Sequence, residues 1–511
     1  MSDRKSRVLK GFFASLGGGV LLQIVSLLVI PLYLDFTSQE LFGIWLTLGA
    51  VLSWIQISDM GLGLSLTKRS VEALEESDYE LLRRLIFGSI FSTLFFGAMV
   101  AAVGFLITDF LINFFGIREI YQQSFIQTYH LLLLIAVLGP SLATFSSIIN
   151  AKQHIAFLNI KNTSLKLISI AVTIFLLFND FGIVSFAYGL LSEFFLMIII
   201  DLVYLKKIDR KISLYPFKTS VKEVLSLIKF GSSYQALKIA NVISTNTDNI
   251  IIASILGASS VTIFVFTGKL AFLLAVFLIS VLPSVLFPGI AQLFELSDNM
   301  KIEKVYSKLT EFSLRLGLFS GITYLYVNEA FISIWVGLEN YGGDLVTIAF
   351  VLWIFIESFI RGLTSIILAS GSLSGYTVVS LMEAMLNITF TLLLIDHFGL
   401  IGVVLGTVIS RIITLFYVPW KINSLLSIKS SSYIKNILKN IIIYSIPMLL
   451  VGYGINSMAI FSEEPILYIL TIIASLLFTN VFLYEGIFLI SQKGLSLKNR
   501  IKSLKDEYYS V

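Results

Sequence analysis

The sequence predicts an all-α polytopic membrane protein with about 14 transmembrane helices, arranged as two six-helix direct-repeat lobes followed by a C-terminal helix pair. Three observations predict this fold: an apolar composition, a regular succession of apolar stretches, and a one-sided distribution of Lys and Arg. The chain has 511 residues, of which 57% are hydrophobic and 13% charged, and its mean hydropathy is +0.91. A soluble domain cannot bury that much apolar surface, whereas lipid solvates it directly.

Apolar stretches long enough to cross hydrocarbon as helices recur along the chain. The first follows a basic start, MSDRKSRVLK, but it is long and no small-residue cleavage site follows. We therefore expect a permanent helix rather than a signal peptide. The predicted spans are 12–34, 41–66, 85–112, 126–150, 162–178, 182–205, 227–254, 261–288, 309–336, 345–370, 376–395, 399–420, 437–457 and 465–490.

Lys and Arg fall almost entirely on one side of these spans. The connections on the side of the N-terminus carry 28 of them, including six in the central segment Lys206–Lys222, whereas the opposite side carries Arg118 alone. Because positively charged loops stay in the cytoplasm, both termini are predicted to be cytoplasmic. The outward loops are short, so no external domain is expected.

The residues after the central segment partly repeat those before it, at an offset of 217 or 218. Each repeat would hold six helices, an even number, so the two would be direct repeats related by an axis along the membrane normal. Two such bundles that enclose a cleft predict a transporter. The predicted divisions are an N-terminal lobe 1–205, a basic linker 206–226, a second lobe 227–424, and a helix pair with a basic tail, 425–511. The repeated residues are Ser147, Ile148, Ile149 and Ala151, which recur as Ser365, Ile366, Ile367 and Ala369, and Leu177, Phe181, Gly182 and Gly189, which recur as Leu394, Phe398, Gly399 and Gly406.

The composition also excludes several classes of chemistry. Cys is absent, which excludes thiol catalysis, disulfides and Cys-ligated metals. His130, His154 and His397 are scattered without metal-ligand spacing. The formal net charge of +4 reflects basic loops beside a membrane rather than nucleic-acid binding. We expect no metal, no cofactor and no enzymatic activity.

Seven Lys and Arg residues lie within or at the edges of the spans. Three of them, Lys166, Lys229 and Arg315, lie near cytoplasmic ends and are predicted to be interfacial anchors. The other four lie deeper, where a cation costs about 2.5 to 3.5 kcal/mol on insertion scales, so they should face a cleft or an acidic partner. These four predicted substrate-binding residues are Lys238, Lys269, Arg361 and Arg411.

The acidic candidates within the spans are Asp59, Glu193, Asp248, Glu357 and Glu383. Asp248 could pair with Lys269 at similar depth across a tight turn, and Glu357 shares a helix face with Arg361 four residues on. Either these couples neutralise each other, or the cations bind an anionic substrate while carboxylates bind a coupling ion or proton. For that ion-coupling role we predict Asp59, Asp248 and Glu357. Lys238 and Arg411 could equally be cleft residues or members of cross-helix ion pairs.

Several segments resemble the polysaccharide flippases of the multidrug/oligosaccharidyl-lipid/polysaccharide exporter superfamily, which include the Wzx-type O-antigen flippases. The resemblance covers about residues 10 to 420, and the final pair of helices is similar to the fourteen-span members. The segments that carry it are PLYLDFTSQELFGIWLTL at Pro31–Leu48, Asp59–Gly63 with Lys68 and Arg69, DNIIIASILGASSVTIF at Asp248–Phe264 with Pro283 and Pro288, and Asn387–Thr407 with FGLIGVVLGT.

The resemblance implies that the protein moves an undecaprenyl-diphosphate-linked oligosaccharide from the cytoplasmic to the outer leaflet of the bacterial inner membrane by alternating access. It implies a cationic cleft for the diphosphate and sugars, with the lipid tail left in the bilayer. It further implies a role in O-antigen or other surface polysaccharide assembly, with a polysaccharide polymerase and a chain-length regulator as partners. The chain has no ATP-binding motif, in keeping with ion-gradient coupling.

Three alternatives stay open on the sequence. A multidrug/cation antiporter of the same superfamily would favour an acidic cleft, and the four deep cations oppose it. A lipid II flippase would share the architecture. A membrane glycan polymerase or ligase would need a sizeable external loop, which the distribution of charges does not provide.

Overall fold

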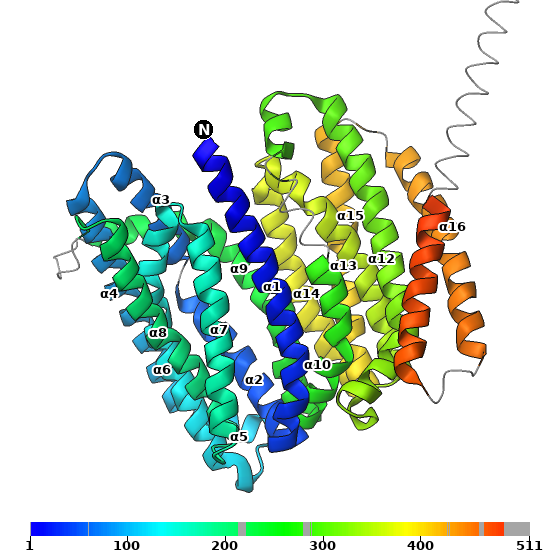
Figure 1. Cartoon of the computed structure of the whole chain (residues 1–511), viewed down its shortest axis with the longest axis horizontal. Coiled ribbons are helices and arrows are strands. Elements are labelled where there is room, and N and C mark those ends of the chain that lie inside the picture. Colours follow the sequence, from blue (N-terminus) through cyan, green and yellow to red (C-terminus); the bar gives the residue numbers. More distant parts are fainter. Residues whose placement is uncertain are drawn as a thin grey trace, which may run out of the picture. The chain divides into compact units, whose positions relative to one another are not determined.

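The computed structural model describes residues 2–59, 61–212, 221–278, 287, 289–426, 428, 430–458 and 464–484, and these form helices and short connections without any strand (Figure 1). The predicted all-α fold is confirmed. Up to the central linker the helices are α1 (Ser2–Phe36), α2 (Gln39–Ile55), the 3₁₀ turn η1 (Gln56–Asp59), α3 (Leu62–Glu75), α4 (Tyr79–Leu106), α5 (Thr108–Phe114), α6 (Glu119–Ala151), α7 (Ile155–Leu177) and α8 (Val184–Ile208). After it come α9 (Val221–Leu256), α10 (Ala258–Phe272), the π-helical η2 (Leu273–Leu278), α12 (Asn299–Trp335), η3 (Leu338–Asn340), α13 (Asp344–Ala369), α14 (Leu373–Phe398), α15 (Leu400–Leu426) and α16 (Ser430–Ser457).

Twelve helices in the described part of the chain are long and apolar enough to cross a membrane, the last being Pro465–Tyr484. The two other predicted spans fall on α2, a shorter apolar helix of 17 residues, and on α12, a helix of 37 residues. The protein is therefore a multi-pass membrane protein. Several predicted features lie outside the described residues: residues 213–220 of the linker, the end of the eighth span with Pro283 and Pro288, and the end of the fourteenth span with the basic tail, from residue 485 on.

The predicted span 41–66 is wrong as a single helix. Helix α2 ends at Ile55, η1 follows, and α3 begins only at Leu62. Gly61 has φ of +69°, a left-handed conformation that glycine adopts without a Cβ penalty. Because the residues on both sides of the break are apolar, hydropathy does not detect it.

The chain packs as two compact units, and the first comprises Met1–Val265 and Ser374–Ser410. One hydrophobic core of this unit joins side chains from six helices: Leu66 of α3, Leu85 of α4, Ile148 of α6, Leu158 of α7, Leu205 of α8 and Leu227 of α9. Helix α3 is thus held by its apolar face against the ends of longer helices. The continuation of the chain after the break in span 41–66 is packed rather than free.

The start of the basic linker is anchored to this unit through Asp209. Its carboxylate accepts hydrogen bonds from Lys152 Nζ at 2.6 Å, from the Tyr79 hydroxyl at 3.1 Å and from the Lys211 backbone N–H at 3.0 Å. Burial alone would raise the pKa of the Asp209 carboxyl, but these donors hold that pKa below its usual value. These contacts therefore fix the first residues after α8 against α4 and the end of α6.

The second unit comprises Phe266–Leu373 and Arg411–Val511. Arg315 of α12, whose role as an interfacial anchor stays a prediction, contacts a neighbouring helix of this unit. Its Nη2 donates to Asn480 Oδ1 at 3.0 Å, and its guanidinium carbon lies 3.9 Å from the centroid of the Tyr484 ring. Cation–π and hydrogen-bonding contacts of this kind stabilise the docking of the terminal helix Pro465–Tyr484 on α12.

The predicted division into lobes 1–205 and 227–424 stays a prediction, since the two compact units have other boundaries. Local geometry nevertheless repeats at the predicted offset. Gly182, between α7 and α8, has φ of +55°, and Gly399, between α14 and α15, has φ of +57°. Both connections need a left-handed residue, which explains why glycine recurs there.

Candidate functional site

A group of buried polar side chains surrounds Asp248 within the first unit. Asp248 lies on α9 and is 7% exposed. Its Oδ2 accepts a hydrogen bond from Thr407 Oγ1 of α15 at 3.2 Å, and Asn387 Nδ2 of α14 donates to the same hydroxyl oxygen at 2.9 Å. The Thr391 hydroxyl of α14 also interacts with the carboxyl group. Three helices therefore converge on one carboxylate, and we name these four residues the Asp248 cluster.

Three oxygens of the Asp248 cluster are buried without a hydrogen bond of good geometry among the described residues: Asp248 Oδ1, Asn387 Oδ1 and Thr391 Oγ1. An unsatisfied carboxylate oxygen inside a membrane protein is costly, so it calls for a ligand. Carboxylate, amide and hydroxyl oxygens suit a hard cation, and a proton on the carboxylate would satisfy it equally. The cluster has the chemistry of a site for a small cation.

Sequence reasoning selected Asp248 but missed its partners. Asn387, Thr391 and Thr407 are uncharged, and polar residues without charge give no signal in a count of intramembrane charges. Their spacing could have found them, because Asn387 and Thr391 stand four residues apart and share a helix face. The predicted pair of Asp248 and Lys269 stays a prediction, since the two residues belong to different units.

Glu357 is the centre of a second charged group, in the second unit. It lies on α13 and is 1% exposed, and its Oε1 accepts a hydrogen bond from Arg361 Nε, which confirms the predicted pairing along the helix. Arg411 Nε of α15 lies 3.1 Å from Glu357 Oε2. The cross-helix ion pair is therefore the alternative that the structure favours for Arg411.

Two guanidinium groups therefore meet at this single carboxylate. The side chain of Arg361 is 33% exposed and that of Arg411 is 15% exposed. Lys269 of α10 lies in the same unit and forms no ion pair with the unit's described residues. The second unit thus holds more positive than negative charge within its helices at these predicted positions, as an anion site requires.

Lys238 of α9 also forms a cross-helix ion pair, in the first unit. Its Nζ lies 2.7 Å from Asp59 Oδ2, at the break between α2 and α3. The side chain of Lys238 is 39% exposed and that of Asp59 is 26% exposed, so this pair is far more accessible than Glu357. Of the predicted interfacial anchors, Lys166 is exposed and 3.3 Å from Glu193, while the side chain of Lys229 lies outside the described residues.

The structure also contains a buried ion pair that the sequence did not reveal. Lys161 was expected in the loop 151–161, but it lies within α7, and its Nζ donates to Asp201 Oδ1 of α8 at 2.6 Å and to Ser146 Oγ of α6 at 2.8 Å. The two charged side chains are 2% and 0% exposed. Lys161 and Asp201 each stand twenty residues from Phe181, which lies in the connection between α7 and α8. From this equal spacing the sequence could have predicted that the two side chains meet across the antiparallel helices.

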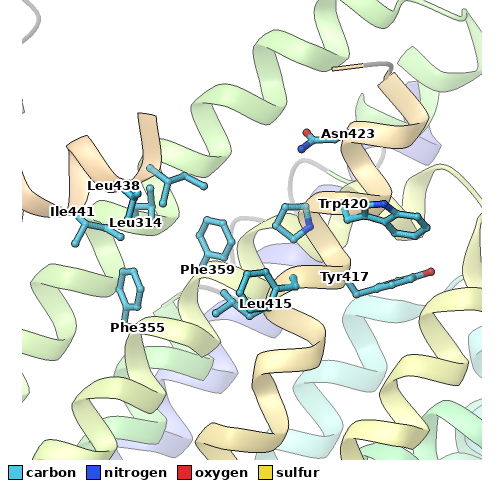
Figure 2. Close-up of a pocket in the computed structure, with 12 residues that line it drawn as sticks. Leu314, Phe355, Phe359, Leu415, Tyr417, Trp420, Asn423, Leu438 and Ile441 are labelled. Carbon is cyan, nitrogen blue, oxygen red and sulfur yellow. The ribbon is translucent and has the colours of Figure 1, made fainter. Parts of the chain in front are cut away.

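An apolar cavity of about 620 Å³ lies within the second unit, between α12, α13, α15 and α16 (Figure 2). A second cavity, of about 490 Å³, lies within the first unit between α6, α7 and α8. Both have almost no polar lining, so they suit hydrocarbon rather than a charged headgroup. The larger cavity is lined by Leu314, Phe355, Phe359, Leu415, Phe416, Tyr417, Pro419, Trp420, Asn423, Ile437, Leu438 and Ile441.

Comparison with known proteins places this architecture in a family. Residues 8–294 match the family model described as polysaccharide biosynthesis protein. The chain belongs to this family. Within the curated proteins it is similar to the capsular polysaccharide biosynthesis protein CapF of Staphylococcus aureus, with 26% identity over 275 residues, which are 50% of this chain and 66% of that protein. The chain thus matches slightly less than two thirds of the length of CapF.

The fold of this chain is similar to that of two solved membrane proteins. The lipid II flippase MurJ, in an inward closed conformation, is 15% identical with a TM-score of 0.67 and covers 97% of this chain and 100% of its own. An inward-facing multidrug resistance MATE family transporter of the MOP superfamily is 16% identical with a TM-score of 0.62, covering 79% of this chain and 98% of its own. The predicted resemblance to the exporter superfamily is confirmed.

Proposed function

We propose that this protein moves a lipid-linked oligosaccharide that bears a diphosphate from the cytoplasmic to the outer leaflet of the bacterial inner membrane. Transport proceeds by alternating access, with both termini cytoplasmic, and forms or breaks no covalent bond. Membership of the polysaccharide biosynthesis family and the fold shared with MurJ support a transporter for surface polysaccharide assembly. A membrane polymerase and a chain-length regulator are the partners that such a role requires.

The observation that carries the proposal is the convergence of two guanidinium groups on Glu357, since Arg361 and Arg411 both contact its carboxylate. Guanidinium groups match phosphate oxygens in geometry, and neighbouring guanidinium groups suit the two phosphates of a diphosphate. We assign Arg361 and Arg411 to the diphosphate, with Lys269 of the same unit as a third cation. These three positively charged residues would repel the cationic compounds that a multidrug/cation antiporter transports, so they argue against that alternative.

The apolar cavity of the second unit supports the lipid part of the substrate. Its wall includes the rings of Phe355 and Phe359 on α13, the helix that also carries Glu357 and Arg361 (Figure 2). Hydrocarbon from a polyprenyl chain would bury apolar surface there at a gain of roughly 25 cal/mol per Å². In a bilayer the polyprenyl chain would compete with ordinary lipid tails for this cavity. The cavity would therefore help to position the substrate but would not select it over other lipids.

The Asp248 cluster supports coupling to a cation gradient. A small cation or a proton bound at Asp248 satisfies its free Oδ1 and links α9 to α14 and α15. Transporter sites of this kind use carboxylates and helix oxygens near the middle of the membrane. Asp59 and Glu357, the other predicted ion-coupling residues, already face Lys238 and two arginines, so we assign the coupling ion to Asp248 first.

The test is a deletion strain in which lipid-linked oligosaccharide is extracted and its structure determined. We expect lipid-linked oligosaccharide to accumulate in the deletion strain. Reintroducing the wild-type gene should restore surface glycan. Arg411→Gln should abolish surface glycan with the protein still inserted, because Arg361 continues to neutralise Glu357 while the second guanidinium group is gone. Arg411→Lys, which keeps the charge, is the matched control and should retain part of the activity.

Two results would overturn the proposal. Wild-type surface glycan in the Arg411→Gln strain would remove Arg411 from the mechanism. A deletion strain that accumulates no lipid-linked oligosaccharide but becomes sensitive to cationic drugs would identify a multidrug antiporter instead.

A further inference from the structure

The break between α2 and α3 leaves backbone carbonyls that another helix satisfies. In a continuous α-helix the Ile57 carbonyl would accept the Gly61 N–H. Here the Gly61 N–H donates to Asp59 Oδ1 at 3.0 Å, so the Ile57 carbonyl needs another donor. Gln235 of α9 supplies it through Nε2. The broken turn is therefore held in part from α9.

Lys238 holds the same turn from one helical turn further along α9. Its ammonium donates to the Gln56 carbonyl at 3.3 Å and to Asp59 Oδ2 at 2.7 Å. A cation at this position also interacts favourably with the negative end of the α2 helix dipole. Residues i and i+3 of a helix lie on one face, which explains how Gln235 and Lys238 reach adjacent carbonyls.

The two residues of α9 differ in how easily they can be displaced. Gln235 is neutral and 8% exposed, whereas the side chain of Lys238 is 39% exposed and charged. An ion pair as accessible as Lys238–Asp59 contributes little stability, because water screens the two charges. A diphosphate carries more charge than one carboxylate, and charge-assisted hydrogen bonds to phosphate are strong. Lys238 is the contact that an anion can take away.

We propose that Lys238 is a releasable latch on the break between α2 and α3, and that the diphosphate of the transported lipid opens it by competing with Asp59 for the ammonium group, in a step separate from its binding at Arg361 and Arg411. This inference rests on the proposed function, because it takes the diphosphate as the ligand. Gln235 keeps its bond to the Ile57 carbonyl, so α2 stays folded while the turn at Gln56–Asp59 loosens. Substrate binding is thereby linked to movement of a helix break.

The latch makes an unusual prediction for Asp59. Since Asp59 competes with the diphosphate, Asp59→Asn should bind it more tightly, by about 1.4- to 5-fold, the factor that corresponds to an exposed ion pair. Asparagine keeps the Oδ1 that accepts the Gly61 N–H. If Asp59 served only to stabilise the break, or bound a cation that the substrate required, affinity would be unchanged or weaker.

The experiment measures amide hydrogen exchange of the full chain in lipid nanodiscs, for the peptide that covers residues 54–64. Farnesyl diphosphate and inorganic pyrophosphate are the probes, with sodium sulfate at equal ionic strength as the control anion. Wild-type exchange should rise with a diphosphate. Lys238→Met should exchange fast without any probe and respond to none, whereas Gln235→Leu should exchange faster at baseline and still respond.

A response to both probes would show that the diphosphate group alone opens the latch, and a response to farnesyl diphosphate alone would assign the opening to the lipid-linked form. The latch is overturned if both probes leave wild-type exchange unchanged, or if Asp59→Asn binds them no more tightly. Accumulation of lipid-linked oligosaccharide in the deletion strain tests the proposed function separately, so either result can fail while the other stands.

Discussion

The helix pairs α7–α8 and α14–α15 pack in the same way, with equivalent residues separated by the repeat offset. A Cβ on Gly189 of α8 would lie 2.1 Å from Thr173 Oγ1 of α7, and a Cβ on Gly406 of α15 would lie 2.7 Å from Thr391 Oγ1 of α14. Neither distance is possible for real atoms, so both positions need glycine. In each pair the second helix approaches the first at a threonine, as small residues allow in membrane proteins.

The pairs differ in how their charge is satisfied. In α7–α8 the Lys161–Asp201 ion pair is closed by Ser146 and is 0 to 2% exposed. Beside α14–α15, the partners of Asp248 among the described residues are the hydroxyls of Thr407 and Thr391, and Ile30 and Pro31 stand at the offset where the first repeat would need its own carboxylate. The first pair contains its own counter-ion, whereas the second packs against an α9 carboxylate whose described partners are uncharged. We propose that a coupling ion binds beside the second pair.

The largest expected effect is the loss of that carboxylate. Asp248→Asn removes the charge that holds a cation, so surface glycan should fall by more than about tenfold, as a loss of 1.4 kcal/mol or more in cation binding would produce. Thr173→Val in the first pair is the matched control and should leave glycan close to wild type. Quantified surface polysaccharide, with membrane insertion checked by blotting, makes the measurement. Equal loss in both variants would erase the distinction between the pairs.

The next effect concerns the ion pair of α7–α8. Lys161→Met leaves Asp201 as a buried charge without a counter-ion, so the free energy of unfolding should fall by about 3 to 5 kcal/mol. The double variant Lys161→Met/Asp201→Leu should recover most of that stability, because replacing both charges by apolar groups is often neutral. Unfolding in detergent by denaturant measures both. A double variant as unstable as the single one would refute charge compensation as the role of the pair.

A smaller and symmetrical effect is expected at the two glycines. Gly189→Ala and Gly406→Ala should each lower the free energy of unfolding by about 1 to 3 kcal/mol, the usual cost of overpacking. Gly49→Ala in α2 is the control, since no atom lies within 4 Å of its added Cβ. Thermal unfolding of the three variants compares them. Destabilisation at one glycine alone would show that the close approach is not a shared feature.

The smallest effect is at Asp209, outside both pairs. Its pKa is depressed by its donors, so its stabilisation is present above the unfolded pKa of about 3.9 and is lost as pH falls through the lower folded value. Asp209→Asn should cost less than about 1 kcal/mol at neutral pH, and this difference should shrink below about pH 4. Unfolding curves across that range measure it. A difference that persists in acid would assign the contribution to packing instead.

The features of the fold and site that could be predicted from the sequence are those marked by charged residues. The one-sided Lys and Arg, the spacing of Glu357 and Arg361, and Asp248 as a candidate were all accessible, because a charge in hydrocarbon must be explained wherever it falls. The break at Gly61 was not accessible, since it depends on a backbone conformation inside an apolar run. Thr407, 159 residues from Asp248, was equally hidden because a hydroxyl is common in membrane helices.

The depth of Lys161 was misjudged for a related reason. A hydropathy boundary placed the start of its helix after it, whereas α7 begins at Ile155. A buried lysine lowers local hydropathy and so mimics a loop. Only a partner of opposite charge at equal depth, here Asp201, distinguishes the two cases.

The most direct test of the account is the rate at which purified protein in proteoliposomes translocates lipid-linked oligosaccharide, measured with and without a sodium or proton gradient. The account predicts that one of these gradients accelerates the wild-type protein, and that Asp248→Asn shows only a slow rate that no gradient changes. Wild-type translocation at the same rate without any cation gradient, or a gradient response that survives in Asp248→Asn, would contradict it.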